Sequence, residues 1–135
     1  MHFIHLKTTS HKQCVDITER VREIVRAAQV ETGLCHVMAL HATAAIIVNE
    51  NYDPDIGSDL IKALDRAVPE HAGWQHDEVD NNAQAHINAA ILGPSEIIPI
   101  ENGDLVLGRW QGIMFVELDG PRSDRKVSVQ IMKSG

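Results

Sequence analysis

The chain has 135 residues, a length that suits one domain with one hydrophobic core. Hydrophobic residues make up 44% of the sequence and charged residues 23%, which excludes a disordered or collagen-like chain. With 12 Lys and Arg against 19 Asp and Glu, the net charge is −7, so the composition provides no general attraction to nucleic acid or to an anionic membrane.

Two features concern the compartment in which the protein works. Cys14 and Cys35 form neither a CxxC motif nor a disulfide framework, so we interpret them as reduced thiols. Residues 1–6 lack the charged and apolar regions of a secretion signal. No apolar run approaches the roughly 20 residues that a membrane span requires. The sequence therefore predicts a cytoplasmic protein with no membrane partner.

The first half of the chain alternates strands with amphipathic helices. Strands are expected at residues 3–7, 14–17, 34–41 and 44–48, the last as the central strand of a sheet. A first helix is expected to begin with Thr18 as its N-cap and to end at Gly33. A second helix carries the apolar residues of 56–68 and ends at Pro69.

The second half begins with a stretch without periodicity and ends in strands. Residues 69–80 follow no pattern, and a connection of this length is more often functional than idle. Asn81 or Asn82 is expected to cap a helix that Gly93 closes. Strands are expected at residues 96–100, 105–107, 113–118 and 126–132, with an Asn102-Gly103 hairpin turn. The prediction is a single α+β domain over residues 1–135, with packed helices on a mixed or mostly antiparallel sheet.

Three of the eight histidines adjoin polar segments that periodicity does not explain: His41, His76 and His86. An ordinary surface or core role is the commoner one for a histidine, and the spacing of these three matches no known metal motif. Three converging imidazoles would nevertheless leave an open position for water or substrate on a divalent ion, as catalytic sites require.

An acceptor-rich block follows the strand predicted at 44–48. Asn49 and Glu50 are the best site candidates in it, because they continue directly from a buried strand. The alternative is plain turn chemistry over residues 49–55, with Asp55 capping the next helix.

Glycines flank Trp110 and Gln111 in the segment 108–112. They indicate either a bend that presents Trp110 and Gln111 at a rim, or a β-bulge with Trp110 in the core. A local basic cluster at Arg122, Arg125 and Lys126 is a candidate phosphate site, together with Ser95, or else a solvated turn.

Eight short segments carry a resemblance to a known family. They are His41-Ala42-Thr43-Ala44-Ala45, residues 49–55, Trp74-Gln75-His76, residues 80–87, Leu92-Gly93-Pro94-Ser95, residues 98–103, residues 107–113 and Glu117-Leu118-Asp119-Gly120-Pro121-Arg122. In this order and spacing they resemble the YjbQ-like family, also called the secondary thiamine-phosphate synthase family. The sequence departs from the family pattern at Ala42, where a hydroxyl residue is common.

The resemblance implies a homotrimer that binds a divalent metal ion, Zn or Mg, and a weak thiamine-phosphate synthase activity on phosphorylated small molecules. The metal ligands it implies are His41, His76 and His86. The residues it implies for catalysis and substrate binding are Asn49, Glu50, Asp80, Asn82, Ser95, Trp110, Gln111 and Arg122. Two alternatives stay open: a metal-assisted hydrolase, and a non-catalytic trimeric module that binds a metal or metabolite.

Overall fold

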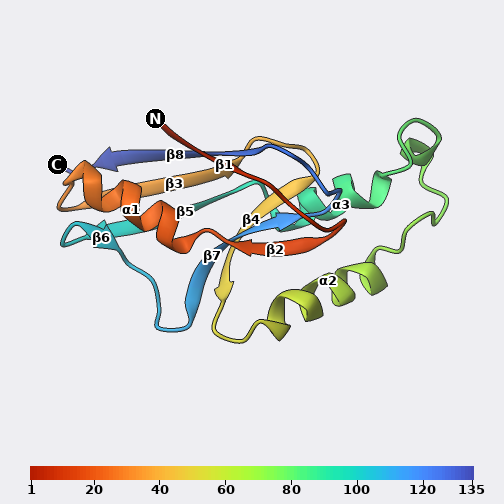
Figure 1. Cartoon of the computed structure of the whole chain (residues 1–135), viewed down its shortest axis with the longest axis horizontal. Coiled ribbons are helices and arrows are strands. Elements are labelled where there is room, and N and C mark those ends of the chain that lie inside the picture. The colour runs from red at the N-terminus through yellow and green to blue at the C-terminus, as the bar shows by residue number, and fades with distance from the viewer.

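The computed structural model describes all residues, 1–135, as two antiparallel sheets and three α-helices (Figure 1). The five-stranded sheet has the order β1 (His2–Leu6), β8 (Arg125–Lys133), β3 (Gly33–Ala39), β5 (Ser95–Glu101) and β6 (Asp104–Leu105). The three-stranded sheet has the order β2 (Gln13–Asp16), β7 (Gln111–Glu117) and β4 (Ala44–Glu50). The helices are α1 (Thr18–Ala28), α2 (Asp55–Ala67) and α3 (Ala83–Leu92), with a 3₁₀ turn η1 (Gln75–Glu78). The predicted α+β class is confirmed.

The main core lies between the inner faces of the two sheets and α1. Alternation along each strand directs one set of side chains inward, such as Val37 on β3 and Phe115 on β7, and α1 adds Val21 and Val25. A second, smaller core joins the other face of the three-stranded sheet to α3. Alanines dominate it, so the helix approaches the sheet closely: Ala45, Ala85, Ala89, Val116 and Leu118.

The start and end of α1 differ from the prediction. Thr18 is the first helical residue and not the N-cap, because the carboxylate of Asp16 accepts hydrogen bonds from both the backbone N–H and the hydroxyl of Thr18. The helix ends at Ala28, where Gln29 takes a left-handed conformation with φ 54°. Gly33 instead opens β3, where a Cβ would lie 2.1 Å from the carbonyl oxygen of Met132.

The strand predicted as central, β4, is an edge strand. It pairs with β7 alone, from Ala44 opposite Glu117 to Glu50 opposite Gln111. Its apolar run reflects burial between α3 and the main core and not two strand neighbours. The β5–β6 hairpin is confirmed, with positive φ at Asn102 and Gly103.

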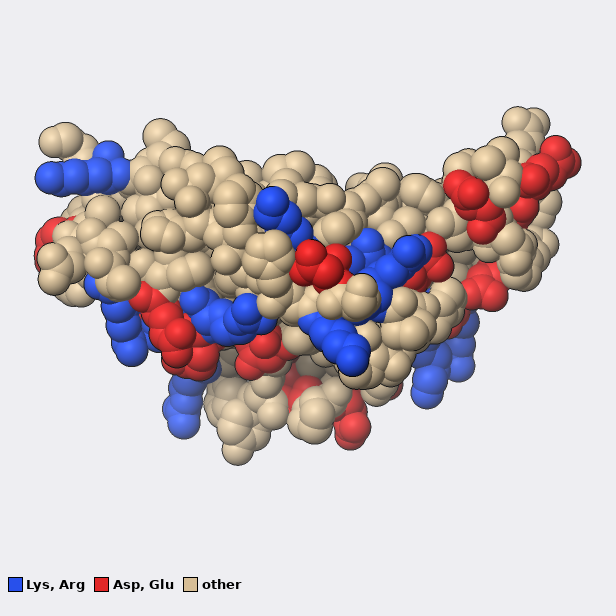
Figure 2. Space-filling model, turned by 45° about the horizontal axis from the view of Figure 1, so that its top comes forward, with Lys and Arg blue, Asp and Glu red and all other residues tan.

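The outer face of the five-stranded sheet carries exposed apolar side chains among polar ones such as His36, Lys126 and Gln130. The side chains that alternate with the core positions stay exposed, among them Phe3, Leu34, Ile97 and Met132. On the face drawn in Figure 2, basic and acidic side chains lie interleaved over the middle, and acidic side chains gather at the right-hand end. No helix has the length and hydrophobicity needed to cross a bilayer.

Candidate functional site

Three separate segments bring together the histidines singled out by the sequence. His41 lies in the turn between β3 and β4, His76 in η1 and His86 on α3. The rings of His76 and His86 meet edge to face, with centroids 4.8 Å apart. His41 and His86 line one cavity of about 290 Å³. We call these three residues the histidine cluster.

The periodicity of α3 explains why its histidine reaches this cavity. Ala85 and Ala89 pack against β4, while His86 and Ala90, four residues apart, share the neighbouring helix face. The remaining walls are small or apolar: Ala42, Ala44, Ala89 and Pro94. The cavity therefore offers two imidazoles in an apolar surround.

One ring nitrogen of His41 is already engaged. Its Nε2 accepts a hydrogen bond from the backbone N–H of Lys126 at 2.8 Å. In the neutral ring the proton therefore sits on Nδ1. Burial lowers the pKa of His41, and the nearby Arg125 guanidinium lowers it further. His41 is thus held neutral, with one hydrogen-bond donor left.

A buried ion pair supports the turn that carries His41. The Arg125 guanidinium binds both oxygens of Glu117 and donates to the Thr43 hydroxyl at 3.0 Å, and the Thr8 hydroxyl donates to Glu117 at 2.6 Å. Burial alone would raise the pKa of Glu117, but hydrogen bonds from Arg125, Thr8 and Asp119 bring it below its ordinary value.

This pair corrects one prediction and adds a feature that sequence reasoning missed. Arg125 was expected in a phosphate site, but it is only 4% exposed and its donors are taken by Glu117 and Thr43. The sequence did contain one sign of a buried ion pair, because Glu117 is a carboxylate at the end of the apolar run of β7.

The histidine cluster fits a metal ion only in part. No hydrogen bond occupies the rings of His76 and His86, and Asp80 lies 3.7 Å from His76 Nε2. His41 fits only if its bond to Lys126 breaks, since its other nitrogen bears the proton. No three His, Cys, Asp or Glu side chains converge closely enough to hold an ion in the single chain.

Other predicted site residues lie at the opposite end of β4. Glu50 ends the strand and lines an open cavity of about 490 Å³ with Tyr52, Asp53, Pro54 and Trp110. The Tyr52 and Trp110 rings meet edge to face at 4.9 Å. We call these five residues the aromatic end. Asn49 precedes Glu50 on the strand.

The two interpretations of Trp110 are resolved in favour of the rim. Trp110 is 47% exposed, so it is not a core residue. Its turn is closed by Gln111, whose side-chain carbonyl accepts a hydrogen bond from the Gly108 N–H at 2.7 Å. Gly112 allows Asn51 to approach, because a Cβ there would lie 2.5 Å from Asn51 Nδ2.

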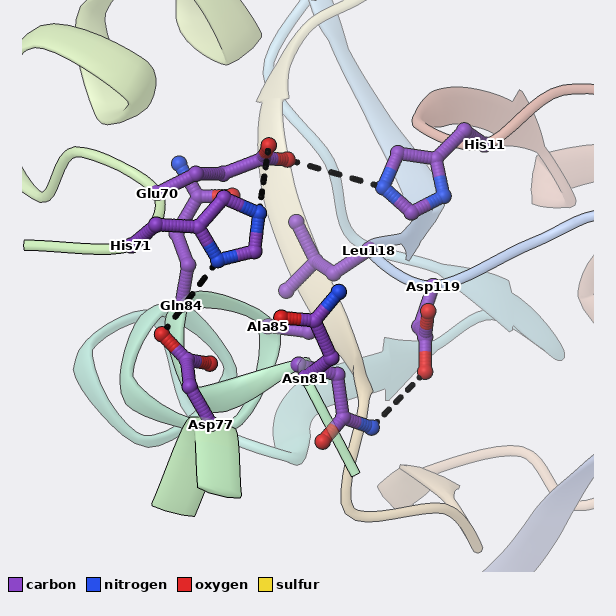
Figure 3. Close-up of a pocket in the computed structure, with 10 residues that line it drawn as sticks. His11, Glu70, His71, Asp77, Asn81, Gln84, Ala85, Leu118 and Asp119 are labelled. Carbon is purple, nitrogen blue, oxygen red and sulfur yellow. Dashed lines mark hydrogen bonds and ion pairs between the residues drawn. The ribbon is translucent and has the colours of Figure 1, made fainter. Parts of the chain in front are cut away.

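Of the remaining predicted residues, only Asn82 lines a further cavity, of about 170 Å³ (Figure 3). Asn82 donates to Asp119 at 2.9 Å, and the Arg122 guanidinium binds the same carboxylate at 3.2 Å. Arg122 is thus half-exposed but paired within its own turn. Asp80 is largely exposed and Ser95 opens β5 opposite Met38, so neither lines this cavity.

The cavity in Figure 3 is rich in acceptors. His71 lies 3.4 Å from Asp77 and 3.8 Å from Glu70, which also lies 3.7 Å from His11. Asn82 is the N-cap residue of α3, as expected, but the hydrogen bond to the helix start comes from Asp77, whose carboxylate accepts the N–H of Ala83.

The fold is a single α+β domain of two antiparallel sheets, with the histidine cluster beside the start of β4. The sequence matches the model of the UPF0047 YjbQ-like family over residues 2–134. The chain is 40% identical to a UPF0047 protein of Methanothermobacter thermautotrophicus, over 92% of this chain and 87% of that one. It is 36% identical to the UPF0047 protein YugU of Bacillus subtilis, over 89% and 90%.

Solved structures of similar proteins have the same fold as this chain. A YbjQ-like protein of unknown function from Sulfolobus solfataricus superposes with a TM-score of 0.95 at 36% identity, covering 98% of this chain and 96% of that one. An uncharacterised protein from Clostridium acetobutylicum superposes at 0.93 with 45% identity, over 98% and 100%. The chain belongs to the YjbQ-like UPF0047 family, as the sequence motifs predicted.

Proposed function

We propose that this protein is a cytoplasmic, metal-dependent enzyme that acts on a phosphorylated small molecule, with thiamine-phosphate synthesis as its secondary activity. The observation that supports the proposal is that His41 and His86, from two separate segments, line one cavity, while His76 from a third segment contacts the ring of His86. The cluster pairs nitrogen ligands with apolar walls, as sites for small organic substrates do.

Two of the histidines would hold the metal ion. His76 and His86 have free rings in contact, and Asp80 lies beside them. A divalent ion there would neutralise the charge that develops on a leaving diphosphate as its bond to the pyrimidine methylene breaks.

The remaining residues would bind and orient the substrate. The alanines and Pro94 give an apolar wall against which an aromatic ring can pack. His41, held neutral and fixed by Lys126, keeps one N–H for a hydrogen bond. Arg122 can bind a phosphate if it leaves Asp119.

We propose a homotrimer whose contacts include the outer face of the five-stranded sheet. Exposed apolar patches of this kind mark association surfaces in proteins without a membrane span. The segment 127–131 contributes by one side only, because Val127 and Val129 are fully buried in the core. Light scattering that returns a single-chain mass near 14.9 kDa at micromolar concentration would contradict the trimer.

One incubation tests the activity. Metal-loaded protein is given the pyrimidine diphosphate with and without the thiazole phosphate, and products are followed by chromatography. Coupled product supports the synthase. Release of pyrophosphate without coupling indicates a hydrolase, and no turnover indicates a binding module. The matched control is His86→Ala, which should abolish any turnover that depends on the cluster.

A further inference from the structure

We infer that the active site is composite: the aromatic end of one copy lies against the histidine cluster of a neighbouring copy. The inference rests on the proposed homotrimer and deepens it, because it states which two surfaces meet. The partner is therefore a second copy of this chain.

The first observation is that one chain cannot join its own two groups. The histidine cluster lies beside Ala44, at the start of β4, and Glu50 ends the strand. Six residue steps of extended chain separate Ala44 from Glu50 by roughly 20 Å. Every residue of β4 is paired with β7, so the strand is a rigid spacer (Figure 1).

The second observation is that the two ends are complementary. The cavity at the histidine cluster is lined by two imidazoles and small apolar residues, with no carboxylate. The aromatic end supplies the carboxylates of Glu50 and Asp53, and no histidine. One oxygen of Glu50 is buried and has no hydrogen-bond partner in the single chain. A carboxylate from a second copy beside His76 and His86 would add a further oxygen ligand to Asp80, which lies 3.7 Å from His76 Nε2 in the single chain.

The third observation is exposure at the aromatic end. Tyr52 is 77% exposed and Trp110 47%, although they contact each other. Exposed Trp and Tyr that project together are typical of the centre of a protein interface. In a ring of three copies every contact is head-to-tail, so two different surfaces must meet. The two ends of β4 are such a pair of surfaces.

A cross-linking experiment tests the contact without any need for activity. The double variant Ala90→Cys/Tyr52→Cys places one thiol at the histidine cavity and one at the aromatic end. Within a chain these positions are too far apart for a disulfide, whose Cα atoms must lie within about 7 Å. Mild oxidation should therefore link chains, up to a covalent trimer on a non-reducing gel.

Controls separate this result from random oxidation. The matched control is Ala90→Cys/Glu23→Cys, with the second thiol on the exposed face of α1, and it should stay unlinked. A second pair, Ala42→Cys/Asp53→Cys, repeats the test at neighbouring positions. An oligomer by light scattering in which neither double variant cross-links would overturn the inference, as would a monomer.

A second measurement uses activity, where the wild-type protein makes coupled product. His86→Ala and Glu50→Gln chains, each inactive alone, are unfolded together and refolded. Random mixing in a composite trimer should restore about one quarter of the wild-type rate, because one in four interfaces has both ends intact. A mixture as inactive as its parents would contradict the composite site. If the wild-type protein has no activity, the cross-link alone tests the contact. Failure of the proposed activity can therefore be distinguished from failure of the composite site.

Discussion

The two ends of β4 are built in opposite ways. At its start, small side chains let α3 approach the sheet, and a fully buried Glu117–Arg125 pair fixes the turn that carries His41. At its end, large aromatic side chains project from loops, and the cavity between them is open. The same strand therefore holds one group of predicted site residues in a packed surround and leaves the other half-exposed.

Folding of the single chain fixes the side chains at the start of β4, whereas those at its end stay exposed and can be fixed by a partner. Buried, hydrogen-bonded groups keep their positions because moving them exposes unpaired charge. The exposed rings of Tyr52 and Trp110 contact each other and Arg109, and they gain most from a further surface. Variants at the two ends should therefore differ in what they change.

The largest expected effect is on stability at the histidine end. Glu117→Gln leaves the Arg125 guanidinium buried without its carboxylate, and breaking a buried pair costs about 3–5 kcal/mol of unfolding free energy. Trp110→Ala at the aromatic end should cost less than about 1.5 kcal/mol in the isolated chain, since the side chain is half-exposed. Urea unfolding at low protein concentration measures the unfolding free energy of both variants. Equal losses of stability would contradict the difference between the two ends of β4.

Metal content should depend on the histidine cluster beside the start of β4. His76→Ala and His86→Ala should each reduce bound metal on purification more than tenfold, because each removes a free imidazole ligand. His41→Ala should reduce it less, since its Nε2 is occupied by Lys126. Elemental analysis measures the ion per chain. Full occupancy in all three variants would exclude the histidine cluster as the metal site.

Phosphate affinity should follow Arg122. Arg122→Ala is expected to weaken pyrophosphate binding at least tenfold, because a lost charge-assisted hydrogen bond is worth about 1.5–3 kcal/mol. The melting temperature should change little, since the side chain is half-exposed and contacts only Asp119. Calorimetric titration of pyrophosphate measures the dissociation constant of Arg122→Ala. The control is Lys62→Ala, which deletes an exposed positive charge on α2. Equal dissociation constants would leave Arg122 as a turn residue only.

Local chemistry explains which features the sequence could predict. The Asn102-Gly103 turn needs two residues at positive φ, and few other pairs tolerate that. The end of α3 at Gly93 is predicted in the same way, because Gly93 takes a positive φ of 92°. Hydrogen bonds to helix starts from side chains outside the helix were harder to predict. The hydrogen bond to the start of α3 comes from Asp77, and that to the start of α1 comes from Asp16 on β2.

The candidate site shows the same limit more sharply. His41 and Glu50 are nine residues apart, and the family resemblance implies a role for each in metal binding or catalysis. Residues 44–50 form the extended strand β4, so His41 lies beside its start and Glu50 at its end. Arg125 looked like a free surface charge because nothing in its neighbourhood reveals that Glu117, across a turn, would bury it. The pair forms where the end of β7 and the start of β8, strands of the two different sheets, meet.

The smallest effect we expect is a pH dependence confined to the histidine end. Because the folded pKa of His41 lies below the ordinary value of 6.5, the unfolded chain binds this proton more readily. Above the unfolded pKa His41 is neutral in both states and does not make stability depend on pH. The free energy of unfolding falls as the pH drops below about 6.5 and toward the folded pKa. His41→Gln keeps an acceptor for the Lys126 N–H but cannot titrate. Urea unfolding at pH 8, 6 and 5 should show a shallower loss for this variant than for the wild type, while Trp110→Ala follows the wild-type slope. If the His41→Gln and wild-type profiles run parallel, burial does not hold this imidazole neutral.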